Sequence, residues 1–309
     1  MFTQIHKLNK ISDNNNFYVK REDFIPTSFG GNKARKAKLF FADIQNKNAD
    51  CVVTYGSSSS NHCRIVANLC ASKGLACYLI SPEENAKETF NSKLMHFFNA
   101  EIITCPVKDV AKTIDNLMML LKEQGKTPYF IAGGGHGNIG TEAYVQCFNE
   151  ILEQQKTIGI NFDYIFHASG TGTTQAGLVC GKLLSKNADS TIVGISIARS
   201  NPRGRQVVVE SVNDYLMEKN VILEVTDIGN SVLFVDDYIC GGYGRTNDDV
   251  NALIKEVLIK EGMPLDHTYT GKAFYGMMDY LKKNKIVGKN ILFIHTGGTP
   301  LFFDDLGGK

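Results

Sequence analysis

The chain has 309 residues, enough to bury a large core, and its 33 lysine and arginine residues nearly balance its 32 aspartate and glutamate residues. The net charge of +1 creates no long-range field that would attract nucleic acid or an anionic membrane surface. The first ten residues, MFTQIHKLNK, contain no apolar export core, and no stretch approaches the roughly 18 apolar residues of a membrane span. We therefore expect a cytoplasmic protein with neither nucleic acid nor a membrane as a partner.

The eight cysteines are scattered and form no CxxC pair; they occupy positions 51, 63, 70, 77, 105, 147, 180 and 240. Most of them lie inside apolar or helix-forming stretches. Such spacing favours reduced, buried thiols over a disulfide framework or a metal site. It agrees with a cytoplasmic location, and we expect no bound metal.

From residue 50 onward, short apolar runs alternate with segments of helical periodicity. β-Branched and aromatic residues cluster in these runs, and glycine or proline punctuates them, as is typical of buried strands. The predicted strands are 50–56, 76–81, 101–106, 128–134, 162–168, 191–198, 231–237 and 290–298, and candidate helices are 62–73, 86–98 and 109–124. The alternation predicts an α/β fold whose mostly parallel sheets carry helices on both faces.

No linker marks a domain boundary within this alternation. A continuous α/β run of this length more often divides into two sheets than forms a single one. We therefore expect two domains, with a break near residue 147.

The first polar motif is FGGNKARK, residues 29–36, which places Lys33 directly behind two glycines and an asparagine. The run could be a basic patch for nucleic acid, the solvated start of a helix, or the setting of a lysine that performs covalent chemistry. The balanced charge argues against the first interpretation. The motif alone leaves the other two open.

The second motif, YGSSSSNHCR at 55–64, links a predicted strand to a predicted helix. Ligands bind at the carboxyl ends of parallel strands, which is where its Ser60, Asn61 and His62 fall. One serine or asparagine would suffice as a helix cap, so a binding role is favoured over capping alone. A serine hydrolase is disfavoured because the GxSxG elbow is absent.

The third motif, ASGTGTTQAGL at 168–178, follows an apolar strand and precedes an apolar helix. Its small residues let backbone N–H groups converge at a positive helix end, which favours an anion. The third glycine, Gly177, is too late for a dinucleotide fingerprint, and no Walker lysine is present. The motif therefore predicts a site for a single phosphate group; the alternative is a tight strand-to-helix turn.

Three further glycine-rich turns adjoin predicted strands, at 133–140, 239–245 and 294–300. Each could be an ordinary loop. Together they indicate that the backbone approaches a flat or phosphate-bearing ligand from several sides. Tyr243 and Tyr269 lie in similar surroundings, where a tyrosine can be catalytic or part of the core.

These motifs, with GGYG, YTGKA and HTGG, occur in an order that resembles the fold type II pyridoxal-phosphate enzymes, specifically the group of 1-aminocyclopropane-1-carboxylate deaminase and D-cysteine desulfhydrase. The resemblance spans Lys20 to Phe302. It implies a homodimer of two-domain, tryptophan synthase β-like subunits. Residues 1–36 and 148–309 would form the large cofactor-binding domain, and residues 37–147 the small one.

The resemblance also implies the cofactor contacts. Lys33 would form the internal aldimine with pyridoxal 5′-phosphate and later act as the proton-transferring base. Asn61 would donate a hydrogen bond to the pyridine 3-oxygen. The phosphate would be held by Ser169, Gly170, Thr171, Gly172, Thr173 and Thr174.

The substrate, a small amino acid, would contact Ser60, Asn61 and His62. Tyr243 and Tyr269 would act as proton relays or substrate contacts, and Ser60 would contribute to catalysis with them. The remaining basic residues of the first motif are interpreted as a partly solvated helix face: Arg35, Lys36 and Lys38.

Thr270 separates the two members of the group. The deaminase pattern has glutamate there, which keeps the pyridine nitrogen protonated, whereas a threonine can only hydrogen-bond that nitrogen. Opening a cyclopropane ring requires a stronger electron sink than losing a thiolate after α-proton removal. Thr270, as a cofactor contact, and His62 therefore favour the desulfhydrase side.

The resulting hypothesis is a β-elimination on D-cysteine or a related β-substituted D-amino acid, giving pyruvate, ammonia and sulfide. The alternatives are deamination of 1-aminocyclopropane-1-carboxylate, elimination or replacement on an L-amino acid, and a non-catalytic sensor of a phosphate-bearing ligand. Ser59, Ile65 and the GGYG turn depart from the pattern of the group close to the expected substrate. The side-chain preference of the pocket is therefore expected to differ.

Overall fold

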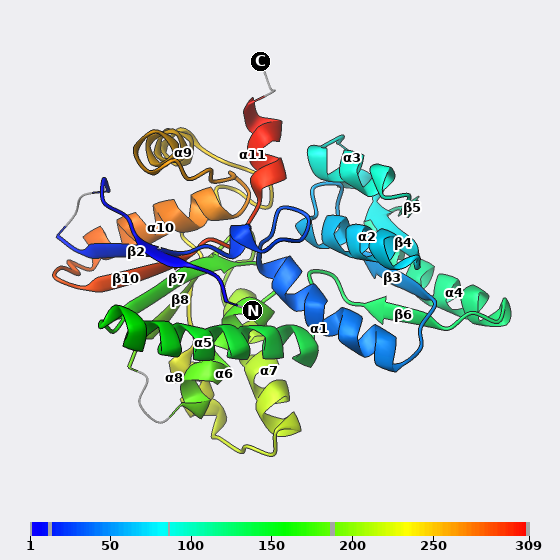
Figure 1. The fold of residues 1–309 in the computed structure, drawn as a ribbon, viewed down its shortest axis with the longest axis horizontal. Coiled ribbons are helices and arrows are strands. Elements are labelled where there is room, and N and C mark those ends of the chain that lie inside the picture. The colour runs from blue at the N-terminus through cyan, green and yellow to red at the C-terminus, as the bar shows by residue number, and fades with distance from the viewer. Residues whose placement is uncertain (1, 12–13, 86, 186–188, 307–309) are drawn as a thin grey trace.

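The computed structural model describes residues 2–11, 14–85, 87–185 and 189–306. Its larger sheet has six strands in the order β1 (Ile5–Lys7), β2 (Asn16–Lys20), β10 (Asn290–Ile294), β7 (Tyr164–Ser169), β8 (Thr191–Ser196) and β9 (Leu233–Val235). All neighbouring strands are parallel except β1, which pairs with β2 in the antiparallel sense. The first and last parts of the chain therefore meet in one sheet (Figure 1).

The smaller sheet is entirely parallel, with the strand order β5 (Glu101–Cys105), β4 (Ala76–Pro82), β3 (Cys51–Tyr55) and β6 (Pro128–Ile131). The central strand β3 is buried from Cys51 to Thr54. A parallel sheet covered on both faces requires such a continuous run rather than an alternating pattern.

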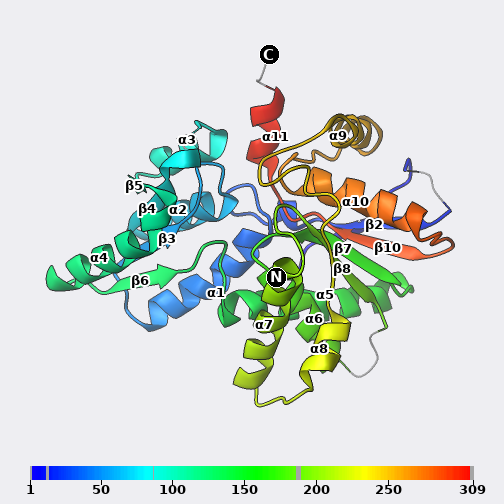
Figure 2. The same ribbon diagram turned by 180° about the vertical axis from the view of Figure 1, so that it is seen from behind.

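Helices cover both faces of the larger sheet (Figures 1 and 2). On one face lie α5 (Asn138–Ile158), α6 (Thr173–Leu184), α7 (Arg203–Glu218) and α8 (Val225–Ser231); on the other lie α9 (Asp248–Glu261) and α10 (Thr270–Lys283). Successive side chains of strand β10 point to opposite faces of the sheet and therefore contact both helix layers. Leu292 and Ile294 pack toward α5 and α6, whereas Ile291 and Phe293 pack toward α10.

The smaller sheet has helices α1 (Asn32–Asn46), α2 (Asn61–Lys73) and α3 (Phe90–Phe97) on one face and α4 (Val110–Glu123) on the other. The last helix, α11 (Thr299–Leu306), extends from the larger part of the molecule to contact α3 (Figure 1). The described residues include the short 3₁₀ segments η1 (Glu22–Phe24), η2 (Glu83–Asn85) and η3 (Val107–Asp109). Within the described residues, no helix combines the length and the apolar character needed to cross a bilayer.

The predicted α/β class with two mostly parallel sheets is confirmed, and the eight predicted strands correspond to β3 to β10. The predicted helix 86–98 corresponds to α3; residue 86 lies outside the described residues. Strands β1 and β2 were not predicted, because β1 is short and largely exposed and β2 follows a polar run.

The predicted boundary after residue 147 falls in the middle of α5. From Ala143 onward the helix packs against α6 and the larger sheet, with Tyr144, Cys147 and Ile151 in the same core cluster, whereas Ile139 in its first turn packs against the core of the smaller sheet. A helix between two sheets carries no local signal of the sheet it will join, so the alternation pattern misplaced this boundary.

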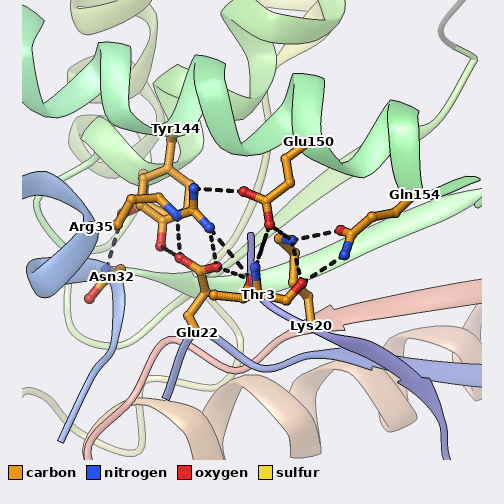
Figure 3. Close-up of polar contacts among 9 residues, drawn as sticks. Thr3, Lys20, Glu22, Asn32, Arg35, Tyr144, Glu150 and Gln154 are labelled. Carbon is orange, nitrogen blue, oxygen red and sulfur yellow. Dashed lines mark hydrogen bonds and ion pairs between the residues drawn. The ribbon is translucent and has the colours of Figure 1, made fainter. Parts of the chain in front are cut away.

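A buried ionic network joins the N-terminus, η1, α1 and α5 (Figure 3). The Arg35 guanidinium donates to both carboxylate oxygens of Glu22, at 2.6 and 2.7 Å, and to Glu150 at 2.9 Å. Lys20 donates to Glu150 at 2.6 Å, and the Thr3 hydroxyl donates to Glu22 at 2.7 Å. Burial alone would raise the pKa of Glu22, but Arg35, with Lys20 and the Thr3 hydroxyl, more than offsets it, and the pKa lies below its ordinary value.

The interpretation of Arg35 and Lys36 as a partly solvated helix face is therefore wrong. Arg35 is 5% exposed and Lys36 is 1% exposed, whereas Lys38 is exposed as expected. Both buried cations point toward partners contributed by distant parts of the chain, which a local reading of KARK cannot reveal.

Candidate active site

A cavity of about 340 Å³ lies between the two sheets, at the carboxyl ends of their strands. Its wall combines segments that follow β3, β6, β7, β8 and β10 with the first turns of α1 and α2. Parallel sheets place ligands at this end because successive loops converge there. The predicted residues Lys33, Ser60, Asn61, His62 and others far apart in the sequence thus share one site.

Lys33 is the second residue of α1. Gly31 precedes the helix at φ = 97°, and a Cβ atom there would lie only 2.6 Å from the carbonyl oxygen of Thr296, so only glycine fits. The Lys33 Nζ lies at the cavity wall and donates to the carbonyl oxygen of Gly134 at 3.0 Å. Burial disfavours its ammonium form and lowers its pKa from 10.5 to about 8.

The loop after β7 forms an anion cradle next to Lys33. Gly172 adopts φ = 102° immediately before α6, so that the first N–H groups of this helix face the loop. Gly170, Thr171, Gly172 and Thr174, which are predicted to hold the phosphate, line the cavity. Asn32 donates to the Thr174 hydroxyl at 3.1 Å and ties the cradle to the start of α1.

Two residues predicted for the cradle lie behind it. The Ser169 hydroxyl donates to the Gln175 side chain at 2.9 Å, and Thr173 accepts a 2.7 Å hydrogen bond from the Nζ of Lys36. Neither belongs to the described cavity wall. Their side chains support the loop because β7 and the first turn of α6 turn them toward the interior.

Lys36 is a functional candidate that the sequence argument missed. Its buried ammonium lies one turn beyond Lys33, and burial together with the Lys33 charge holds its pKa well below the ordinary value. A phosphate in the cradle would offset this unfavourable burial of a cation. The i, i+3 spacing of Lys33 and Lys36, which places them on the same side of a helix, could have indicated this from the sequence.

Ser60, Asn61 and His62 open α2 beside the cavity. Ser60 is the N-cap, and its hydroxyl accepts from the Cys63 N–H at 3.2 Å, so capping and cavity lining coincide in one residue. The Asn61 Oδ1 accepts from the Asn91 side chain at 3.0 Å. The N-terminus of α2 thus presents N–H groups to this side of the cavity.

His62 is neutral and has a defined tautomer. The Thr54 hydroxyl donates to the carbonyl oxygen of Ile131 at 2.7 Å, so at 2.9 Å it accepts from His62 Nε2, which carries the proton. Burial, with the charges of Lys33 and Lys36, holds the pKa of His62 well below 6.5. His62 therefore contributes a neutral ring to the wall, not a cation.

Tyr243 and Tyr269 meet at the cavity wall, where their hydroxyls are 2.5 Å apart. Ser59, which departs from the group pattern, places its hydroxyl 3.3 Å from that of Tyr243. Burial and the neighbouring Tyr243 raise the pKa of Tyr269 well above 10, so it keeps its proton. Lys272 donates to the carbonyl oxygens of Ile239 and Gly242 and thereby fixes the loop that carries Tyr243.

Thr270, predicted as a contact of the cofactor ring, is hydrogen-bonded to Asp266. It is absent from the cavity wall within the described residues, and its hydroxyl donates to Asp266 Oδ2 at 2.8 Å while accepting from the Asp266 N–H at 3.0 Å. The i, i−4 relation at the start of α10 brings these two side chains together. Thr296, from the HTGG motif, lines the cavity instead.

The residues present fit pyridoxal phosphate. The cradle and Lys36 suit its phosphate, a lysine with a lowered pKa lies beside them, and an asparagine amide faces the same cavity. Such a site can bond an aldehyde covalently and hold an anion at a fixed distance from it.

Comparison with known proteins agrees with this geometry. The pattern of the family "Pyridoxal-phosphate dependent enzyme" matches residues 2–297. A D-cysteine desulfhydrase of Serratia proteamaculans (strain 568) is 34% identical, with 97% of this chain and 92% of the relative aligned. A protein of Pyrococcus abyssi (strain GE5 / Orsay) with the provisional name 1-aminocyclopropane-1-carboxylate deaminase is 35% identical over 93% and 85% of the two chains.

The structure superposes on a crystal structure of a homologue of 1-aminocyclopropane-1-carboxylate (ACC) deaminase with a TM-score of 0.88. The two sequences are 33% identical, and the superposition covers 99% of this chain and 93% of the other. Family pattern, full-length relatives and fold agree with the arrangement of Lys33 and the anion cradle. The chain belongs to the pyridoxal-phosphate dependent enzymes.

Proposed function

We propose that the protein is a lyase that eliminates the β-substituent of D-cysteine or a related β-substituted D-amino acid, giving pyruvate, ammonia and sulfide. The observation that carries the proposal is the Lys33 amine, with its pKa near 8, beside the cradle of Gly170 to Thr174. The relative named D-cysteine desulfhydrase, aligned over nearly the full length, supports the substrate class.

When bound, pyridoxal phosphate links covalently to an amine and withdraws electrons from the adjacent carbon, which makes the α-proton acidic. The cradle would hold the phosphate, with the Lys36 charge behind it at Thr173, and the first turn of α2 would offer N–H groups to the substrate carboxylate. Lys33 Nζ removes the α-proton, for which its lowered pKa suits it near neutral pH. Tyr269 keeps its phenolic proton and can transfer it toward the departing group, in contact with Tyr243.

Deamination of 1-aminocyclopropane-1-carboxylate is a second candidate with an observation of its own. Thr270 itself carries no charge, which favoured the desulfhydrase, but a neighbouring residue does. The Asp266 carboxylate contacts the Thr270 hydroxyl and its N–H, and it is buried at 1% exposure. If Thr270 lies beside the ring nitrogen, as the resemblance implies, a negative charge on Asp266 behind it would favour a protonated ring, which the deamination requires.

Product analysis separates the candidates. The cofactor-loaded protein is incubated with D-cysteine, L-cysteine and 1-aminocyclopropane-1-carboxylate, and pyruvate, sulfide and 2-oxobutyrate are quantified. We expect pyruvate and sulfide from D-cysteine in excess of every other product. Dominant 2-oxobutyrate would support the second candidate. Covalently bound cofactor without turnover of any β-substituted amino acid would support a sensor instead.

The reaction of Lys33 with pyridoxal phosphate is expected to accelerate with rising pH and to level off above about pH 8. Only the neutral amine attacks the aldehyde, and burial, by disfavouring the ammonium, moves its titration below that of an exposed lysine. Mixing apoprotein with the cofactor at several pH values and following absorbance measures this rate. A rate still rising at about pH 10, the range of an unperturbed lysine, would contradict the pKa argument.

Lys36→Met is expected to weaken binding of pyridoxal phosphate by about tenfold or more, because the positive charge behind the cradle and its hydrogen bond to Thr173 are lost. Binding of pyridoxal, which lacks the phosphate, should change little. Equilibrium titrations with both compounds measure the ratio, and Lys38→Met on the exposed side of α1 is the control. Equal weakening of both compounds would indicate a packing defect rather than loss of the charge behind the phosphate.

We also propose a homodimer in the cytoplasm, with a small amino acid as its ligand and neither nucleic acid nor a membrane as partner. All eight cysteines are unpaired, which supports a reducing compartment. The homodimer follows from the resemblance to the group. Sedimentation of the purified protein tests it.

A further inference from the structure

Asn91 is a fully buried amide next to the candidate site. It is the second residue of α3, and its side chain is 0% exposed. Its Nδ2 donates to the carbonyl oxygen of Ser59 at 2.8 Å and to Asn61 Oδ1 at 3.0 Å. An amide nitrogen carries two N–H groups, so these contacts use the whole donor capacity of Asn91.

The contact defines the orientation of Asn61. The two ends of an asparagine amide have nearly the same shape, so its hydrogen-bond partners decide which end faces which way. Because Oδ1 of Asn61 is bound by Asn91, its Nδ2 is the end left to serve the cavity that Asn61 lines. Without Asn91, the Asn61 amide could equally present its oxygen.

The amide oxygen of Asn91 argues against a purely structural role for this residue. Within the described residues, Asn91 Oδ1 is buried and has no hydrogen-bond partner. A buried amide oxygen without a partner is unfavourable, and an apolar side chain of similar size would avoid that cost. The presence of an amide at this position is explained if its two N–H groups are needed to hold the residues of the neighbouring site in place.

We propose that Asn91 is a positioning residue that holds the Asn61 amide with its N–H donors toward the ring oxygen of bound pyridoxal phosphate. The inference rests on the proposed function, since that oxygen belongs to the cofactor. An N–H donor stabilises the ionised form of this oxygen, whereas an amide oxygen facing it would repel that form.

The first turn of α3 is well anchored for this purpose. The Thr89 hydroxyl donates to the carbonyl oxygen of Ser58 at 2.7 Å, and Thr89 and Ser92 form a reciprocal capping box. The Phe90 N–H donates to Asp304 Oδ1 of α11 at 2.8 Å. Thr89 therefore supports the same loop as Asn91 without touching Asn61, and provides a matched control.

The test compares Asn91→Leu with Thr89→Val, each in the wild-type and the Asn61→Ala background. We measure the equilibrium dissociation constant of pyridoxal phosphate and the absorbance spectrum of the bound cofactor, neither of which depends on turnover. We expect Asn91→Leu to raise the dissociation constant by about tenfold and to shift absorbance from the visible band of the ionised ring toward the near-ultraviolet band of the neutral ring. In the Asn61→Ala background it should add less than about twofold, because no amide remains to be oriented.

An unchanged spectrum and affinity in Asn91→Leu would overturn the inference, as would an equal effect in both backgrounds or the same spectral shift in Thr89→Val. If Asn91→Leu does not fold, Asn91→Ser serves in the same cycle, since its shorter side chain cannot donate to both acceptors. Wild-type protein that binds no cofactor at Lys33 would overturn the proposed function itself. If the wild-type protein binds the cofactor normally and substitution of Asn91 has no effect on affinity or spectrum, only this inference is overturned.

Discussion

Lys33→Ala is expected to lower turnover of the preferred substrate by about three orders of magnitude or more. Lys33 has two roles, covalent attachment of the cofactor and removal of the α-proton, and a positioned base alone contributes about 10²–10⁴-fold. Within the described residues, Lys33 is the only lysine that lines the cavity, so no equivalent amine replaces it.

Steady-state assays with saturating pyridoxal phosphate measure the effect, because excess cofactor compensates for weaker binding. Lys38→Ala is the matched control: it lies on the same helix, is exposed, and should retain wild-type turnover. If Lys33→Ala kept more than about a tenth of the wild-type rate, a base other than Lys33 would be required.

Arg35→Met is expected to lower the free energy of unfolding by about 3–5 kcal/mol. The substitution leaves two buried carboxylates, Glu22 and Glu150, with Lys20 as the remaining cation of the network in Figure 3. Removing one partner of a buried ionic group leaves charge without compensation, and this costs more than the intact group contributes. The network joins η1 and α1 to α5, and α1 begins with the residues around Lys33, so its loss should also loosen the cavity wall.

Urea unfolding followed by circular dichroism measures this loss. Lys47→Met removes the exposed i, i+4 pair with Asp43 at the other end of the same helix and should cost less than about 1 kcal/mol. A loss below about 1 kcal/mol in Arg35→Met as well would show that solvent or a shift of the chain compensates the two carboxylates.

The elements that could be predicted are those whose signal is local. The strands β3 and β7 are continuous apolar runs bounded by glycine or polar turns. The segment 168–178 predicts an anion site because it contains small residues and lies directly before a helix. The rule that ligands bind at the carboxyl ends of parallel strands then places Ser60 and Asn61 at the site, whereas Lys33 was placed there by the resemblance.

The features that could not be predicted depend on contacts between distant segments. Arg35 and Lys36 appear in the sequence as a charged helix face, but Glu150 lies 115 residues away from Arg35, and Thr173 lies 137 residues away from Lys36. Asn91 lies in a stretch without a motif. Only packing of α3 against the start of α2 brings it to Asn61.

Thr270 illustrates a different limit. Its position after Tyr269 made it a cofactor contact by resemblance, yet a hydroxyl can satisfy itself within its own turn. Asp266, four residues earlier, accepts a hydrogen bond from the Thr270 hydroxyl and also from the N–H groups of Thr268 and Tyr269. A local hydrogen-bond partner thus decided the direction of a side chain that the motif had left undetermined.

Peptide mapping of the borohydride-reduced, cofactor-loaded protein tests the central claim most directly. Reduction fixes the bond between amine and aldehyde, and mass spectrometry then locates the added pyridoxyl group. Our prediction is one modified peptide, with the group on Lys33 at full occupancy. A group found on Lys36, on another lysine, or on none would contradict it.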